Sequence, residues 1–200
     1  MHAGHLHAVA RVAGEADDDR VARLDALARA GHAVQHWPST YSVGGARLQF
    51  LSAALSVVVP TLDEAEALPA TLAAARQPGV REVIVVDGGS RDGTLAVARP
   101  LADRVLQAPR GRARQMNAGA AAARGDVLLF LHADTRLPAG YAQAVAGALA
   151  DPAVVGGRFD VRLDAAGLAY RAIGRLISLR SRLTRVATGD QAIFVRRAVF

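Results

Sequence analysis

The stretch Leu55-Ser56-Val57-Val58-Val59, which is followed by Pro60, decides the fold class of this chain. A short, β-branched apolar run that stops at a turn residue is typical of a strand buried on both faces, as in parallel sheets. Three further runs of this kind follow, at 82–87, 104–106 and 126–131. We therefore expect four strands that belong to one parallel sheet.

Helical patterns separate these four strands. We expect helices at 69–76, 94–102, 112–124 and 138–150, and Gly125 is expected to end the third of them. Regular alternation of strand and helix predicts an α/β fold with a mostly parallel, Rossmann-like sheet and helices on both faces.

The first fifty-four residues differ from the rest and carry no chemical motif. Their histidines are loosely spaced, and no acidic ligand stands at a regular distance from them: His2, His5, His7, His32 and His36. We therefore expect a flexible or loosely packed N-terminal extension at 1–54 rather than a metal site. The domain itself is expected at 55–200.

Composition and charge exclude several classes of protein. The chain has 200 residues and no cysteine, which excludes disulfides and cysteine nucleophiles. Residues 1–10 contain no apolar core of a secretory signal, so a cytoplasmic location is expected. The net charge is +6, and residues 158–200 carry all of this surplus, with nine arginines against three aspartates. A surplus confined to one segment indicates a local anionic partner rather than a nucleic acid.

Ligands of open α/β sheets bind beyond the carboxyl ends of the parallel strands. Asp87 and Asp134 each follow an apolar strand, at a place where a carboxylate has no packing role. Each could also cap the helix that comes next. With glycines beside Asp87 and a histidine near Asp134, we expect a functional site at this edge.

Two carboxylates at one sheet edge suit a sugar nucleotide. One can accept hydrogen bonds from the base or ribose, and the other can hold Mg²⁺ or Mn²⁺ between the two phosphates. In His132-Ala133-Asp134 the two polar side chains are two residues apart, so both could turn toward one ion. Arg112 and Arg114 follow in a loop where guanidinium groups suit phosphate.

Four segments together resemble the family 2 glycosyltransferases. They are LSVVVPTLDE at 55–64, VIVVDGGSRDGT at 83–94, GRARQMNAG at 111–119 and LLFLHADT at 128–135. The resemblance implies the GT-A fold, a nucleotide-diphosphate sugar donor, a divalent metal and inverting transfer. It is nearest to the bacterial subfamily associated with arsenosugar biosynthesis, in which FLHADT and GDQAIFVRR recur.

The resemblance also implies roles for single residues. Asp134, with His132, would hold the metal, and Asp190, in Gly189-Asp190-Gln191, would be the catalytic candidate near the acceptor. The donor nucleotide would be bound by Pro60, Thr61, Glu64, Asp87, Arg112, Arg114 and Asn117.

This sequence departs from the family at both ends. Residues 1–54 have no counterpart in it, and the family continues past GDQAIFVRR to an acidic pair that supplies the general base. We therefore expect the fold to be incomplete at the C-terminal end, and the base to lie beyond Phe200. The alternative function is a non-catalytic donor-fold remnant, or a binding module with a basic interfacial helix.

Other nucleotide-binding classes fit less well. A nicotinamide oxidoreductase needs Gly-x-Gly-x-x-Gly after its first strand, where this chain has Pro60-Thr61-Leu62-Asp63-Glu64. A P-loop enzyme needs a lysine, and the chain has none.

Residues 168–186 predict an amphipathic helix. Four of its arginines fall in one sector, and its large apolar side chains fall on the opposite half: Arg171, Arg175, Arg182 and Arg185, against Leu168, Ile173, Leu176, Ile177, Leu179 and Leu183. Arg180 is the exception to this separation. Either the apolar half packs on the sheet and water solvates the arginines, or the helix rests on an anionic membrane at the inner face.

Overall fold

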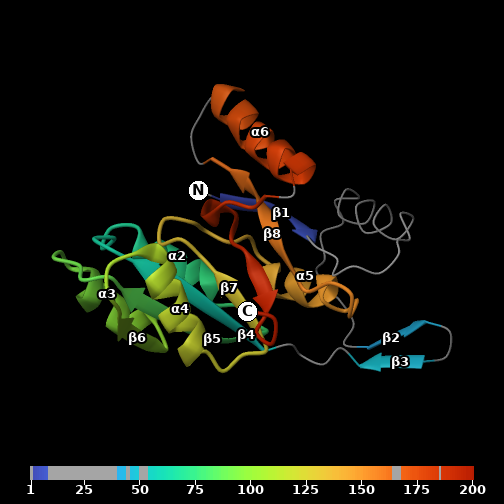
Figure 1. The fold of residues 1–200 in the computed structure, drawn as a ribbon, viewed down its shortest axis with the longest axis horizontal. Coiled ribbons are helices and arrows are strands. Elements are labelled where there is room, and N and C mark those ends of the chain that lie inside the picture. The colour runs from blue at the N-terminus through green and yellow to red at the C-terminus, as the bar shows by residue number, and fades with distance from the viewer. Residues whose placement is uncertain (1, 9–39, 44–45, 50–53, 164–167, 185) are drawn as a thin grey trace.

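The structure is a computed structural model that describes residues 2–8, 40–43, 46–49, 54–163, 168–184 and 186–200 (Figure 1). Its centre is a group of four parallel strands in the order β6-β5-β4-β7. Their bounds are Leu55–Thr61 for β4, Val80–Asp87 for β5, Arg104–Gln107 for β6 and Val127–Phe130 for β7. The four predicted strands are thus confirmed.

Helices cover both faces of this sheet, as predicted. They are α2 (Leu68–Ala75), α3 (Thr94–Leu101), α4 (Arg112–Ala122) and α5 (Tyr141–Ala148). Side chains alternate across each strand, so Val57 and Val59 join the core under α2, α3 and α5, while Val58 joins the core under α4. Because both faces are buried, the strands are apolar at nearly every position.

Three antiparallel strands extend the sheet beyond β7, and the sequence pattern did not predict them. β9 (Phe194–Arg196) pairs with β7, β8 (Gly156–Arg162) pairs with β9, and β1 (His2–Ala8) pairs with β8. β8 escaped prediction because its sequence, GGRFDVR, places two glycines and three charged residues in a strand.

The N-terminal fifty-four residues contribute in part to this structure. His2, His5 and His7 lie on β1 at the edge of the sheet, and His32 and His36 lie outside the described residues. A separate hairpin joins β2 (Thr40–Val43) to β3 (Ala46–Gln49). The division into 1–54 and 55–200 stays a prediction.

Two local predictions were wrong. Pro60 does not end its strand, because β4 continues to Thr61, where it pairs with Asp87 of β5 after its pairing with β7 has stopped at Val58. Gly125 does not end a helix, because α4 has already ended before it. Gly125 is instead required for close packing, since a Cβ there would collide with the Ala54 carbonyl and Ser56.

α6 (Leu168–Thr184) lies against β8, away from the helices of the parallel sheet (Figure 1). Its small residues Gly174, Ser178 and Ser181 are buried, whereas the large apolar Leu176 and Leu183 are 63% and 76% exposed. The expectation that its apolar half packs on the sheet is therefore wrong. No helix within the described residues is long and apolar enough to span a bilayer.

Candidate functional site

The strand order β6-β5-β4-β7 places a topological switch point between β4 and β7. The chain moves outward from β4 through β5 to β6, and α4 then returns it to the other side of β4. A crevice forms at the carboxyl ends of two strands whose connections leave in opposite directions. The loops after β4 and β7, which contain Glu64 and Asp134, flank this point.

Hydrogen bonds tie the loop after β4 to the loop after β5. The Asp63 N–H donates to the Ser90 hydroxyl (2.9 Å), and the Arg91 N–H donates to the Asp63 carboxylate (2.7 Å). The Ala65 N–H donates to Asp92 (3.1 Å). Asp63 has φ +56°, a left-handed conformation that aspartate tolerates better than most residues. The rim on this side of the crevice is therefore cross-braced.

Asp87 is fully buried at the end of β5 and shapes the glycine turn that follows. Its carboxylate accepts hydrogen bonds from the N–H groups of Gly89 (2.9 Å) and Ser90 (3.1 Å), and from the Ser90 hydroxyl. Asp87 thus caps a turn rather than the next helix. Its place at the strand end agrees with the sequence prediction, and contact with a nucleoside stays a prediction.

Gln115 on α4 is a structural residue of this edge that the sequence analysis missed. Its side-chain N–H₂ donates to the carbonyls of Thr61 (2.7 Å) and Val86 (2.8 Å), which joins the ends of β4 and β5. The Thr61 hydroxyl also bonds to the Val86 carbonyl (3.4 Å). The signal in the sequence was a glutamine inside a predicted helix that is rich in alanine.

Glu64 shows that carboxylates crowd this edge. Its side chain is half-buried, and its pKa is raised first by burial and then by the negative charges of Asp134 and Asp92. Arg112, at the start of α4, opposes this rise. Residues from three separate loops and from the start of α4 therefore interact electrostatically at this edge.

The pKa of His132 responds to two of the charges that act on Glu64, those of Arg112 and Asp134. Burial, and then the positive charge of Arg112, lower its pKa, while Asp134 and Asp190 act in the opposite direction. The His132 ring is therefore neutral near pH 7. Its Nε2 atom is buried and has no hydrogen-bond partner among the described residues. A Cβ placed on Gly189 would lie 2.7 Å from this atom, so the turn of residues 189–191 closes over His132.

The structure brings together the residues that the sequence analysis proposed from distant segments. Electrostatic interactions connect five of them: Glu64, Arg112, His132, Asp134 and Asp190. Arg114 and Asn117 lie exposed on the first turns of α4. Pro60 is half-buried and Thr61 is buried, and both lie at the carboxyl end of β4. Asp92 belongs to this edge and was missed, because its sequence pattern resembles an ordinary turn.

The arrangement offers carboxylates and arginines to a ligand that carries both a cation and anionic groups. Among the described residues, no three His, Cys, Asp or Glu side chains are grouped so that they could hold a metal ion by themselves. A cation at this edge would therefore need further ligands from the bound molecule.

Comparisons with known proteins agree with this geometry. Residues 56–198 match the family model described as Glycosyl transferase family 2. The chain is 42% identical over 91 residues to a PGL/p-HBAD biosynthesis glycosyltransferase of Mycobacterium bovis BCG, which covers 41% of this chain and 36% of that protein. It is 39% identical over 88 residues to an uncharacterized glycosyltransferase of Mycobacterium tuberculosis, over 44% of this chain and 39% of that protein.

A solved structure shares the fold. Glucosyl-3-phosphoglycerate synthase from Mycobacterium tuberculosis, in complex with Mn²⁺, uridine diphosphate and glucosyl-3-phosphoglycerate, aligns with a TM-score of 0.53 and 21% identity. The alignment covers 82% of this chain and 63% of the synthase. The expected GT-A-like α/β fold is thereby confirmed. The chain spans little more than a third of the length of the curated relatives that it matches.

Proposed function

Because the chain belongs to glycosyl transferase family 2, we propose that it binds a nucleotide-diphosphate sugar at the β4–β7 switch point and transfers the sugar to an acceptor. The observation that carries this proposal is the electrostatic cluster of Glu64, Arg112, His132, Asp134 and Asp190 at the carboxyl edge of the sheet. Like-charged groups destabilise a fold unless a ligand compensates them, so their concentration here indicates a binding site.

The donor nucleotide is assigned to the rim formed by the loops after β4 and β5. In this assignment Glu64 supplies an acceptor for the base or ribose, and the main chain at Pro60 and Thr61 lines the end of β4. Asp87, which is fully buried, holds the glycine turn beside them, and its direct contact with the nucleoside stays a prediction. Arg112, Arg114 and Asn117 on the first turns of α4 face the diphosphate in this assignment. The positive end of a helix dipole also favours an anion there.

Asp134 and His132 are the residues that would hold a divalent metal. The observations that fit this role are the exposed carboxylate of Asp134, the neutral imidazole of His132 and its buried, unpartnered Nε2. Neutral imidazole is the form that binds metals. Mg²⁺ or Mn²⁺ at this place would neutralise the charge that develops on the leaving diphosphate. The solved glucosyl-3-phosphoglycerate synthase, which shares the fold, was determined in complex with Mn²⁺ and uridine diphosphate.

Asp190 is assigned to the acceptor side. The turn of residues 189–191 brings it into electrostatic contact with His132. In inverting transfer, a carboxylate takes the proton of the acceptor hydroxyl while the oxygen attacks the anomeric carbon and the nucleoside diphosphate leaves. Asp190 is the candidate for this proton transfer among residues 1–200, and the general base that the resemblance implies beyond Phe200 stays a prediction. A cytoplasmic location and membership of the arsenosugar subfamily stay predictions.

The test is a binding and turnover assay with defined nucleotides. The purified chain is mixed with uridine, guanosine, adenosine or cytidine diphosphate, with and without Mn²⁺, and its melting temperature is measured. The matching diphosphate should stabilise the chain more with Mn²⁺ than with a chelator, because Asp134 would help to hold the metal and the metal would neutralise the charge of the diphosphate. Release of diphosphate from the corresponding nucleotide sugar then measures turnover.

Asp126 supplies a matched control, since it lies exposed just before β7 whereas Asp134 lies just after it. Asp126→Asn should keep the metal-dependent stabilisation, and Asp134→Asn should lose it. Binding without any release of diphosphate would contradict a catalytic role of Asp190, and it would agree both with the non-catalytic alternative and with the predicted base beyond Phe200. No stabilisation by any of the four diphosphates would contradict the proposed donor site.

A further inference from the structure

α6 is held to the sheet by its small and polar residues. Gly174 lies so close to β8 that a Cβ would be 2.9 Å from the Val161 carbonyl. The Val161 N–H donates to the Ser178 hydroxyl (3.2 Å), and both Ser178 and Ser181 are buried. The orientation of this helix about its own axis is therefore determined by specific contacts and not by burial of its large apolar side chains.

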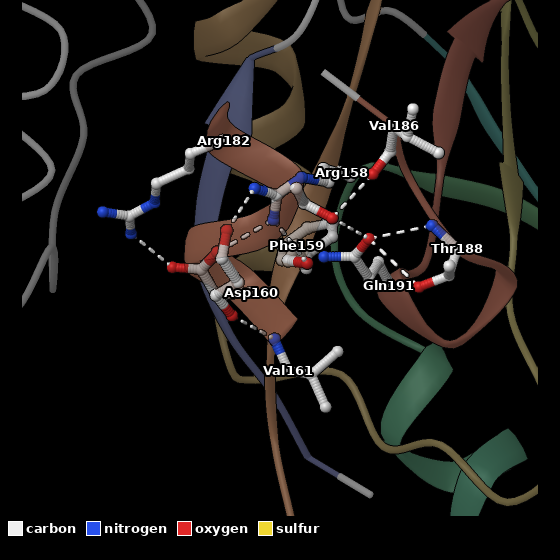
Figure 2. Close-up of polar contacts among 10 residues, drawn as sticks. Arg158, Phe159, Asp160, Val161, Arg182, Val186, Thr188 and Gln191 are labelled. Atoms are coloured by element: carbon white, nitrogen blue, oxygen red, sulfur yellow. Dashed lines mark hydrogen bonds and ion pairs between the residues drawn. The ribbon is translucent and has the colours of Figure 1, made fainter. Parts of the chain in front are cut away.

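A buried ionic network reinforces this orientation (Figure 2). Arg158 of β8, which is 1% exposed, donates to Asp160 (2.8 Å) and to the Ser178 carbonyl of α6 (3.2 Å). Asp160 also pairs with Arg182 of α6 (2.6 Å). Breaking a buried pair leaves an uncompensated charge, so the network opposes rotation of α6 that would bury its apolar side.

The opposite side of α6 carries large apolar side chains into solvent. The exposed fractions are 45% for Ile173, 63% for Leu176, 49% for Leu179 and 76% for Leu183. At 100° per residue these four side chains fall within a sector of about 120°. Single exposed apolar residues are ordinary, but a contiguous apolar sector marks an interaction surface. We call these four residues the apolar sector of α6.

Positive charge lies beside and within the apolar sector, since at 100° per residue Arg175 falls about 40° outside it and Arg180 falls between Ile173 and Leu176. Arg175 and Arg180 are exposed, and the seventeen residues of α6 contain no aspartate or glutamate. The surrounding segment 158–200 carries the whole net charge of +6. A helix with an apolar face, flanking arginines and no acids is complementary to the headgroup region of an anionic bilayer, where the apolar side chains enter the acyl boundary.

We propose that α6 docks on an anionic lipid surface through the apolar sector, with Arg175 and Arg180 contacting lipid headgroups. Both a bilayer and a protein partner could cover apolar side chains. The positive charge of α6, which contains no acidic residue, favours lipid, because an anionic membrane surface is continuous and needs no shape complementarity.

Docking would also place the candidate acceptor turn near the membrane. The Ser181 hydroxyl lies 2.7 Å from the Gln191 side-chain oxygen, which also accepts the Thr188 N–H (2.9 Å) (Figure 2). The turn at 189–191 that carries Asp190 is thus joined to α6. This consequence depends on the proposed function, whereas docking itself does not.

The test is co-sedimentation of the whole chain with vesicles, which requires no enzymatic activity. Vesicles of phosphatidylcholine alone are compared with vesicles that contain phosphatidylglycerol, at low and high salt. We expect binding that requires phosphatidylglycerol and weakens with salt. Arg175→Gln with Arg180→Gln should weaken binding about 25-fold, since each arginine contributes roughly fivefold. Leu176→Gln and Leu183→Gln should each weaken it roughly tenfold or more.

Matched controls come from exposed residues outside α6. Arg81→Gln with Arg124→Gln removes the same charge from exposed positions outside α6, and Val199→Gln replaces an apolar residue that is 54% exposed. These controls should bind vesicles like the parent chain. All α6 variants should keep the parent's melting temperature, because the replaced side chains are exposed.

Three results would overturn the proposal. The first is no binding to phosphatidylglycerol vesicles at low salt. The second is equal loss of binding in the control and α6 variants, which would indicate net charge alone. The third is a dimer in sedimentation without lipid that Leu176→Gln dissociates, which would make a second copy of the chain the occupant of this face.

Discussion

Replacement of Asp134 by asparagine tests the electrostatic cluster and the donor site together. Asparagine keeps the size of the side chain but removes its charge. In the structure, the charge of Asp134 raises the pKa of Glu64, so ionised Glu64 destabilises the ligand-free fold near pH 7. Removal of that charge should slightly raise the melting temperature of the ligand-free chain, while stabilisation by Mn²⁺ with a nucleoside diphosphate should disappear.

The rise in melting temperature of the ligand-free variant should be small, whereas its loss of stabilisation by the ligand should be large. A ligand at a hundredfold excess over its dissociation constant adds about 2.7 kcal/mol of stability. For a domain of this length, 1 kcal/mol corresponds to about 2–4 °C, so the parent chain should gain about 5–10 °C. The Asp134→Asn variant should gain no more with Mn²⁺ than it gains with a chelator.

The assay is thermal unfolding followed by fluorescence or circular dichroism, with Asp126→Asn measured in parallel. Asp126 lies at the opposite end of β7, so its replacement changes charge equally and leaves the cluster intact. An equal metal-dependent gain in parent and Asp134→Asn would refute the assignment of Asp134. A lower melting temperature of the ligand-free variant would refute the electrostatic argument itself.

Four further substitutions test the framework of the site. Asp87→Asn should lower the free energy of unfolding in urea by about 1–3 kcal/mol, because the donors of the glycine turn lose a buried, charged acceptor; an unchanged value would contradict that role. Hydrogen bonds to Asp92 lower its pKa, so its contribution to the stability of the fold is present above pH about 4 and is lost as pH falls. Asp92→Asn should therefore destabilise the chain at pH 7 and progressively less in acid. A difference in stability between variant and parent that stays constant with pH would argue against this role of Asp92. Glu64 has a raised pKa, so its replacement should have the opposite effect on stability. Glu64→Gln should be more stable than the parent at pH 7 and equal to it below pH about 4. A less stable variant at pH 7 would count against the crowding of carboxylates around Glu64. Gly119→Ala should cost about 1–3 kcal/mol by thermal unfolding because its Cβ would collide with Val58, and full stability would show that α4 sits farther from the sheet.

The sequence determined the parallel half of the sheet because that half obeys simple patterns. Strands buried on both faces must be apolar throughout, and parallel strands need crossover helices, so β4, β5, β7 and their helices could be predicted from composition along the chain. The same logic located Asp87 and Asp134, since carboxyl ends of parallel strands share one edge. Short polar segments that follow apolar strands were sufficient to predict where the candidate site lies on the sheet.

The antiparallel half depended on tertiary structure. β8 buries Arg158 and Asp160, which no hydrophobic pattern could predict, because these charges are acceptable only beside partners from α6. Gln115, likewise, is buried because carbonyls of two different strands meet its side chain.

The orientation of α6 shows most clearly which features the sequence determined and which depended on tertiary structure. Its sequence determined a helix with separate apolar and basic sectors, because periodicity depends only on spacing along the chain. Which sector meets the sheet was decided by Gly174, by the bond from Val161 to Ser178 and by the Asp160–Arg182 pair. Those contacts join residues from separate elements, and together they outweighed the preference of leucine for burial, so only the folded chain could reveal an apolar face turned outward.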